Sequence, residues 1–261
     1  MVPVSVVIIT KNTADIINGC IDKARQITDD IIIIYNGEAD DATTDGCRIY
    51  KKQWDGYSAN KNKGIEAAKY NWILSIDADE IPDDTLIAAL NTVEYNNPAI
   101  VYDIKFRSYF GYKLIKWGSW GRDHHIRLFN RSKVKWSEAV VHETLMIPAY
   151  IQVKKLEGCI HHYSAKDADQ FNSKGDYYAK LSAKKYFRSG KRAGFVKLYL
   201  SPVFGFIKSY IIYLGFLDGH DGWRIAKITI KNTRRKYQLL SQMENGQHKN
   251  QPVKDAFVVE Y

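Results

Sequence analysis

Cysteine and proline are scarce in this sequence, and it contains neither a C-x-x-C pair nor the pattern of a signal peptide. The 261 residues include three cysteines and six prolines. The cysteines are widely spaced, at Cys20, Cys47 and Cys159, and form no C-x-x-C pair. We therefore expect neither a disulfide framework nor a zinc site. We also expect the protein to work in a reducing compartment. The start of the chain has no basic leader and no small-residue cleavage site, which indicates a first strand rather than a signal peptide.

Negative charge is also in short supply. Lys and Arg number 38 against 29 Asp and Glu, a net charge of +9, which favours an anionic partner such as a nucleotide, a phospholipid or a phosphorylated glycan. The basic residues are scattered and no RRM signature or paired zinc ligands are present, so we expect no nucleic-acid partner. Hydrophobic residues make up 45% and charged residues 26%, an ordinary globular composition.

The first 80 residues alternate between strand and helix patterns. Residues 4–9, 30–35 and 72–76 are apolar, β-branched runs typical of buried strands. Between them, residues 17–24 show helical spacing of apolar side chains, and a second helix is expected at about 59–69. This order predicts the parallel half of a doubly wound α/β sheet. No G-x-G-x-x-G follows the first strand, which argues against a Rossmann dinucleotide site.

Three acids follow the third of these strands directly: Asp77, Asp79 and Glu80. On an extended backbone Asp77 and Asp79 point to the same side. The carboxyl ends of strands in open α/β sheets are where ligands bind, and two hard oxygen donors there suit Mg²⁺ or Mn²⁺ shared with a diphosphate. A polar loop without function, with Asp83 and Asp84 capping the next helix, would explain the same residues.

Downstream patterns are shorter. Residues 99–110 alternate as a strand, residues 111–121 read as an aromatic, glycine-rich loop over the site, and short strands are expected at 126–130 and 134–136. After about residue 160 the sequence becomes helical and polar.

Residues 195–217 are dense in apolar side chains and long enough to cross a membrane. Lys197, Ser201 and Lys208 stack on one helical face, however, which predicts an amphipathic element. Such an element suits either the surface of a bilayer or a helix packed on the catalytic domain. A second basic cluster follows at residues 227–236. We therefore expect a catalytic domain at 1–160, a helical, basic and aromatic extension at 161–245, and a flexible tail at 246–261.

Several motifs together resemble those of glycosyltransferase family 2, whose members have the GT-A fold: Ser5–Asn12, Trp54–Tyr57, Lys61–Asn62 and Leu74–Glu80. Three more resemble the bacterial lipopolysaccharide-core β-glucosyltransferases: Ile126–Phe129, Val141–Glu143 and Leu214–Gly219. The likeness covers about residues 4–235. It implies a mixed, mostly parallel α/β sheet flanked by helices, with a C-terminal helical extension.

The resemblance implies an inverting transfer of a hexose, glucose in this group, from a UDP-sugar to a lipopolysaccharide-core or lipid-linked saccharide. Mn²⁺ or Mg²⁺ would be held by Asp77 and Asp79, with His142 as a further ligand or simply a cap of its strand. Glu143 is the first candidate for the catalytic base and Asp123 the second. Glu143 could instead form an ion pair with Arg127 or Arg131. The enzyme would work in the cytoplasm, with peripheral contact to the inner membrane.

The resemblance also implies which residues bind the nucleotide-sugar donor: Thr10, Lys11, Asn12, Tyr35, Asn36, Lys61 and Asp77. The family usually has Asp where this chain has Tyr35. Tyr35 could stack on the base while Asn36 or Asp40 supplies the hydrogen bonds, which leaves the identity of the base open. Two other functions remain: a transferase acting on a capsule or exopolysaccharide intermediate, and a non-catalytic nucleotide-binding relative.

Overall fold

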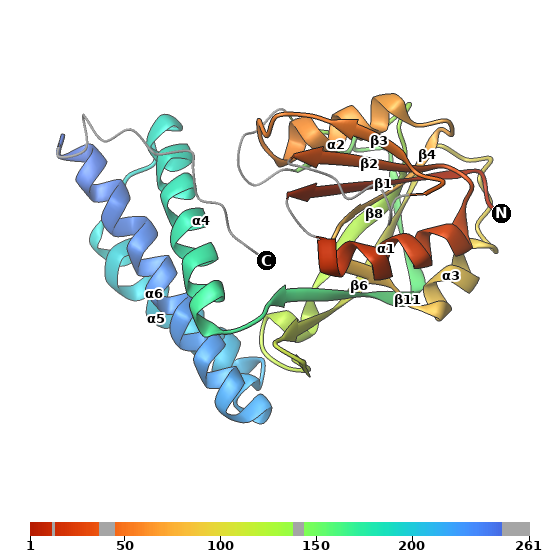
Figure 1. The fold of residues 1–261 in the computed structure, drawn as a ribbon. Helices are drawn as coiled ribbons and strands as arrows, with labels where there is room; N and C mark the ends of the chain where they lie inside the picture. Colours follow the sequence, from red (N-terminus) through yellow and green to blue (C-terminus); the bar gives the residue numbers. More distant parts are fainter. Residues whose placement is uncertain (12–13, 37–44, 138–143, 247–261) are drawn as a thin grey trace. The chain divides into compact units, whose positions relative to one another are not determined.

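The computed structural model of the chain describes residues 1–11, 14–36, 45–137 and 144–246. These residues form two compact units, which the ribbon in Figure 1 shows. The first unit comprises Met1–Arg107 and Asp123–Tyr163, and the second comprises Ser108–Arg122 and the chain from Ser164 onward.

Four parallel strands form one half of the main sheet, in the order β3-β2-β1-β4. They are β1 (Val4–Lys11), β2 (Ile31–Asn36), β3 (Arg48–Lys51) and β4 (Trp72–Asp77). β1, β2 and β4 coincide with the apolar runs of the sequence, so the predicted parallel half of the sheet is confirmed.

The sheet continues from β4 in the order β8-β6-β11-β5, and β7 pairs with β6. Antiparallel pairing joins β4 to β8, β8 to β6, and β11 to β5. The strands are β5 (Glu80–Pro82), β6 (Ile100–Phe110), β7 (Lys113–Leu114), β8 (His124–Asn130) and β11 (Gln152–Ala165); β9 (Lys135–Trp136) and β10 (Leu145–Met146) form a separate pair.

The strand β11 was not predicted. Its first half is polar and almost wholly exposed, and Gly158 interrupts it with a φ of +86°. The alternation of apolar and polar side chains that marks a strand is therefore absent from its sequence.

Helices cover both faces of the sheet in the first unit: α1 (Ala14–Ile27), α2 (Tyr57–Ala67) and α3 (Asp84–Leu90) (Figure 1). Alternate side chains of β1 pack into two hydrophobic cores, one on each face of the sheet. Val6 and Ile8 pack with Ile21 of α1 and Leu86 of α3, whereas Val7 and its neighbours pack with α2. Because side chains alternate along a strand, a continuous apolar run is what a strand covered on both faces requires.

The second unit is mostly helical, with α4 (Ala168–Arg188), α5 (Ser201–Phe206) and α6 (Gly219–Glu244). π-helical turns at Val196–Leu200 and Ile207–Ile212 flank α5. Within the described part of the chain, no single helix combines the length and apolar character of a membrane span. One pair bent by 70°, Val196–Ile212 with Gly215–Glu244, meets these criteria on length and composition alone.

The stretch 111–121, expected to be a loop, contains β7 and the start of a 3₁₀ turn at Trp120–Arg122 and belongs to the second unit. The carboxylate of Asp218 accepts hydrogen bonds from the backbone N–H groups of Lys116 and Trp117, at 3.1 and 2.8 Å. The beginning of α6 thus holds this segment in place.

Candidate active site

The carboxyl ends of three parallel strands meet at one edge of the sheet. Thr10 of β1 lies opposite Tyr35 of β2, and Lys11 lies opposite Asn36. β4, on the other side of β1, ends in Asp77. The structure therefore confirms that these strand ends share one edge. Four other candidates lie outside the described residues: Asn12, Asp40, His142 and Glu143.

Asp77 is held between two cations. Lys61 Nζ lies 3.1 Å from its Oδ1, and Arg127 Nη2 lies 3.7 Å from its Oδ2. Burial alone would raise the pKa of Asp77, but the positive charges of Lys61 and Arg127 outweigh it and lower the pKa below its usual value. Asp77 is therefore ionised at neutral pH and balances charge in this part of the site.

Glu80 completes a buried network of charges. It is 1% exposed and pairs with Arg127, while its other oxygen accepts a hydrogen bond of 3.1 Å from the backbone N–H of Asp77. Burial raises the pKa of Glu80, with Arg127 opposing and Asp77 adding to this effect. Lys61 is also 1% exposed. The network brings two cations and two carboxylates together and fixes the backbone where the acidic motif begins.

Asp79 faces a histidine that the sequence did not indicate. His162 Nε2 lies 3.7 Å from Asp79 Oδ2, because the pairing of β11 with β5 sets His162 opposite Glu80. Burial alone would lower the pKa of His162, but the carboxylates of Asp79, Glu80 and Asp77 raise it above its usual value. Only a prediction of the strand β11 could have placed His162 near the acidic motif, and that strand was not predicted.

Asp123, the second candidate for the base, pairs with a different histidine. His125 Nε2 lies 3.0 Å from Asp123 Oδ1. Burial alone would raise the pKa of Asp123, but the hydrogen bond and charge of His125, with the charges of His162 and Arg127, lower it. A carboxylate with a lowered pKa is ionised but a weak proton acceptor.

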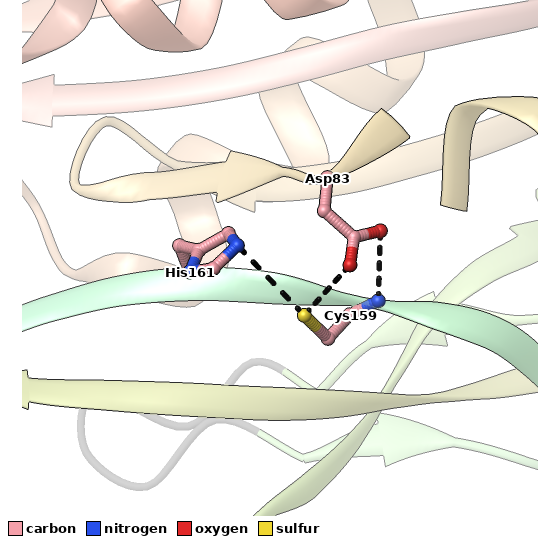
Figure 2. Close-up of side chains that lie close together, drawn as sticks. All are labelled: Asp83, Cys159 and His161. Atoms are coloured by element: carbon pink, nitrogen blue, oxygen red, sulfur yellow. Dashed lines mark hydrogen bonds between the residues drawn. The ribbon is translucent and has the colours of Figure 1, made fainter. Parts of the chain in front are cut away.

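A second group of ligand-type side chains lies at Asp83, Cys159 and His161, whose N, O and S atoms fall within 4.8 Å of one another (Figure 2). Of the two expected caps, Asp83 caps α3 by accepting a hydrogen bond of 2.7 Å from the N–H of Leu86, whereas Asp84 is the first residue of the helix. It also accepts hydrogen bonds from the N–H and the thiol of Cys159, at 3.1 and 2.9 Å. Cys159 Sγ lies 4.0 Å from His161 Nε2.

This group differs from the acidic motif in its chemistry. Burial, then Asp83, raises the pKa of the Cys159 thiol to about 12, so the thiol keeps its proton and donates it to Asp83. Sulfur ligands suit zinc rather than Mg²⁺ or Mn²⁺. Cys159 and His161 also alternate with His162 along β11, which places them on the opposite face of that strand. Among the described residues, Asp83, Cys159 and His161 are the set of three whose ligand atoms converge, whereas at the acidic motif only Asp79 and His162 lie close together, at 3.7 Å.

Comparison with known proteins identifies the family. The sequence model of glycosyl transferase family 2 matches residues 5–152, more than half of the chain, so this chain belongs to that family. An uncharacterized glycosyltransferase of Rickettsia typhi is 27% identical over 242 residues, which covers 85% of this chain and 81% of the relative. The lipopolysaccharide core biosynthesis glycosyltransferase LpsC of Rhizobium meliloti is 26% identical over 264 residues, which covers 91% and 94%.

Among solved structures, S. aureus TarS 1–349 has a TM-score of 0.44 and 11% identity, covering 97% of this chain and 94% of TarS. Glucosyl-3-phosphoglycerate synthase of Mycobacterium tuberculosis, in complex with Mn²⁺, UDP and phosphoglyceric acid, has a TM-score of 0.32 and 20% identity, covering 40% and 43%. These scores are too low to transfer any feature to this chain. The family match and the sheet order define a glycosyltransferase of GT-A fold.

Proposed function

We propose that this glycosyltransferase moves a glucosyl group from UDP-glucose to a lipopolysaccharide-core or lipid-linked saccharide, with inversion at the anomeric carbon. The observation that carries the proposal is the acidic motif Asp77–Asp79 at the carboxyl edge of the sheet, beside the buried cations Lys61 and Arg127. A diphosphate leaving group develops negative charge, which preorganised positive groups stabilise. The similarity to LpsC supports the acceptor class.

Two side chains at the acidic motif, Asp79 and His162, lie close enough to supply ligands to one divalent cation, which supports a metal-dependent transfer. Asp79 supplies carboxylate oxygens, Asp77 is ionised, and His162 adds an imidazole nitrogen 3.7 Å from Asp79. Carboxylates suit both Mg²⁺ and Mn²⁺, whereas an imidazole favours the transition metal, so we propose Mn²⁺ held by Asp77, Asp79 and His162. His142 remains a proposed further ligand. When bound, the cation would neutralise charge on the diphosphate.

The chain's own groups have distinct proposed tasks. Lys61 and Arg127 stabilise charge that leaves with the nucleotide, and the ion pairs with Asp77 and Glu80 keep both side chains oriented. Glu143 takes the proton of the acceptor hydroxyl. Asp123 ranks second because its lowered pKa makes it a weaker base.

The donor's nucleoside has a proposed place at the ends of β1 and β2. Tyr35 is half-buried and presents an aromatic ring beside Thr10, and Asn36 offers an amide beside Lys11. A ring and an amide can together bind a nucleobase by stacking and hydrogen bonding. We propose uracil as the base, with Asn12 contributing as in the family motif.

The second unit carries a large exposed apolar surface, which we propose contacts the cytoplasmic face of the inner membrane. More than half of each of eight apolar or aromatic side chains is exposed: Phe195, Val196, Tyr199, Leu200, Val203, Phe204, Ile211 and Ile212. Soluble proteins seldom expose so many together without a partner. Lys197 and Lys208 border them, as the polar face of an interfacial helix requires.

A thermal-shift screen tests the donor and the metal. UDP-, GDP-, CMP- and ADP-sugars are added with and without Mn²⁺, since a ligand that binds only the folded state raises the melting temperature. We expect stabilisation by the uridine nucleotide that needs Mn²⁺ and disappears in Asp79→Ala. The matched control is Glu157→Ala, which removes an exposed carboxylate of β11. No response to any nucleotide would favour a non-catalytic protein.

A further inference from the structure

We propose that a basic cleft between α4 and α6 binds clustered phosphate groups of the acceptor. The cleft has a volume of about 970 Å³ and is lined by residues of these two helices, which lie side by side (Figure 1). All of the lining residues belong to the second unit. Identifying the ligand as the acceptor rests on the proposed function, whereas the anion site itself does not.

The cleft is supported on both sides by apolar packing. Phe171 of α4 contacts the cluster that contains Ile225 at the start of α6, and Ala183 packs with Tyr237 and Leu240 further along both helices. Between these contacts the helices approach so closely that a Cβ on Gly175 would lie 1.7 Å from Asn232 Nδ2. The walls of the cleft are therefore fixed by the core of the second unit rather than by mobile loops.

Positive charge dominates this cleft. Its charged lining consists of five cations and one acid: Lys180, Lys227, Lys231, Arg234, Arg235 and Asp176. Asp176 pairs with Lys180 at 2.7 Å and with Arg235 at 3.3 Å. Burial alone would raise the pKa of Asp176, but these two partners lower it, so its single charge is already engaged.

The three remaining cations face one another without a neighbouring acid. Lys227, Lys231 and Arg234 lie four and three residues apart, so they share one face of α6. Among the described residues, none of the three has an ion-pair partner within 4 Å. Like charges at this spacing destabilise a helix, and an anion bound between them would relieve that repulsion.

The chemistry of the cleft indicates phosphate groups carried by a large ligand. A guanidinium binds phosphate through two parallel hydrogen bonds, and ammonium groups bind it as point charges. The volume exceeds what one phosphate needs and suits a saccharide that bears several. The phosphate groups could be carried by a soluble saccharide. They could also be the headgroups of anionic lipids, because the exposed apolar surface lies in the same unit.

The test replaces the three cations together, as Lys227→Gln, Lys231→Gln and Arg234→Gln. The control, Lys133→Gln, Lys154→Gln and Lys155→Gln, removes the same charge from exposed positions of the first unit. Binding of inorganic tripolyphosphate in EDTA is measured by calorimetry. Flotation is measured with phosphatidylcholine vesicles with and without phosphatidylglycerol.

We expect the cleft variant to bind tripolyphosphate at least about tenfold more weakly than wild type, because charged hydrogen bonds are lost. The control should bind like wild type, and both should melt at or above the wild-type temperature. A loss confined to tripolyphosphate would assign the site to a saccharide-borne phosphate, and a loss that extends to anionic vesicles would assign it to lipid headgroups. Unchanged binding in the cleft variant, or an equal loss in the control, would overturn the proposal.

Nucleotide binding separates this inference from the proposed function. UDP with Mn²⁺ should stabilise the cleft variant as it stabilises wild type. If UDP stabilises the protein and the cleft variant binds tripolyphosphate normally, the cleft proposal fails alone. If tripolyphosphate binding is weakened in the cleft variant and no nucleotide binds to wild type, the proposed function fails and the anion site stands.

Discussion

Lys61 Nζ lies 3.1 Å from Asp77 Oδ1, and only 1% of this lysine is exposed. A buried charge without its partner costs far more than an exposed one. Asp77 keeps Arg127 at 3.7 Å, so we expect Lys61→Met to lower the free energy of unfolding by less than the roughly 3–5 kcal/mol of a fully unpaired buried charge, and to weaken UDP binding. Lys63→Met on the same helix removes an exposed lysine 3.5 Å from Glu66 and should change stability by less than about 0.5 kcal/mol. Urea unfolding measures both; equal effects would contradict a buried ion pair.

The raised pKa of His162 predicts how stability depends on pH. Its folded-state pKa lies above its unfolded value of about 6.5. The stabilising contribution of the imidazolium is therefore complete below that pH and disappears as pH rises through the folded-state pKa. In metal-free buffer, His162→Gln should lose this dependence, which urea unfolding at a series of pH values measures.

The same histidine predicts the pH dependence of metal binding. An imidazole must lose its proton before it can bind Mn²⁺, so Mn²⁺ affinity should rise as pH increases from 6 to 8, by at most about tenfold per pH unit. His162→Gln should bind more weakly at pH 8, while His220→Gln, at an exposed position of the second unit, should not. Identical calorimetric titrations for His162→Gln and wild type would remove His162 from the metal site.

The catalytic base is tested by isosteric amides. Glu143→Gln should retain UDP binding and lose about a hundredfold or more in kcat, because a positioned base contributes that much. Asp123→Asn should lose less, since its carboxylate pairs with His125. Initial rates with UDP-glucose and a saccharide acceptor measure both. Near-normal turnover in Glu143→Gln, with a large loss in Asp123→Asn, would reverse the assignment.

Vesicle flotation tests the apolar surface of the second unit. Val203→Ser with Phe204→Ser removes two side chains that are 53% and 63% exposed, and should reduce flotation on anionic vesicles at least about fivefold, because apolar burial drives interfacial binding. Lys197→Glu with Lys208→Glu should do the same and make flotation less sensitive to salt. Tyr150→Ser, 62% exposed in the first unit, should have no effect. Flotation unchanged in both paired variants would argue for a protein partner instead.

Asp83 predicts a local effect on α3. Asp83→Ala removes the acceptor for the N–H groups of Leu86 and Cys159, and should cost about 1–2 kcal/mol. Asp84→Ala, next in the chain, removes an exposed carboxylate that pairs with Lys23 and should cost about 0.5 kcal/mol or less. Chemical denaturation compares them. A larger loss in Asp84→Ala would contradict the capping role.

The sequence predicted those parts of the fold whose signals are local. β-branched runs defined β1, β2 and β4, and helical spacing defined α1. Asp83 and Asp84 were both expected to cap the helix, because a carboxylate just before an apolar helical pattern is a local signal, and Asp83 is the residue that does so. The shared edge of Thr10, Tyr35 and Asp77 followed from parallel pairing alone.

Features that depend on distant pairing could not be predicted. His162 meets Asp79 only because β11 pairs with β5 in one register, and a shift by one residue would bring His161 there instead. Arg127 was expected with Glu143 as one alternative, but Glu80 and Asp77 are its described carboxylate partners. Arg127 of β8 lies 47 residues after Glu80 in the chain. No short-range sequence pattern predicts a pairing at this separation.

The way Asp218 holds the backbone of Lys116 and Trp117 has a practical consequence for truncation. The chain enters the second unit at Ser108, leaves it after Arg122 and returns at Ser164. A fragment that stops at Tyr163 would keep residues 108–122 but lose the carboxylate that organises them, so deleting the C-terminal helices leaves an unsupported segment between two strands of the first unit. Separating nucleotide binding from the proposed anion and membrane binding therefore calls for point substitutions rather than a stop codon.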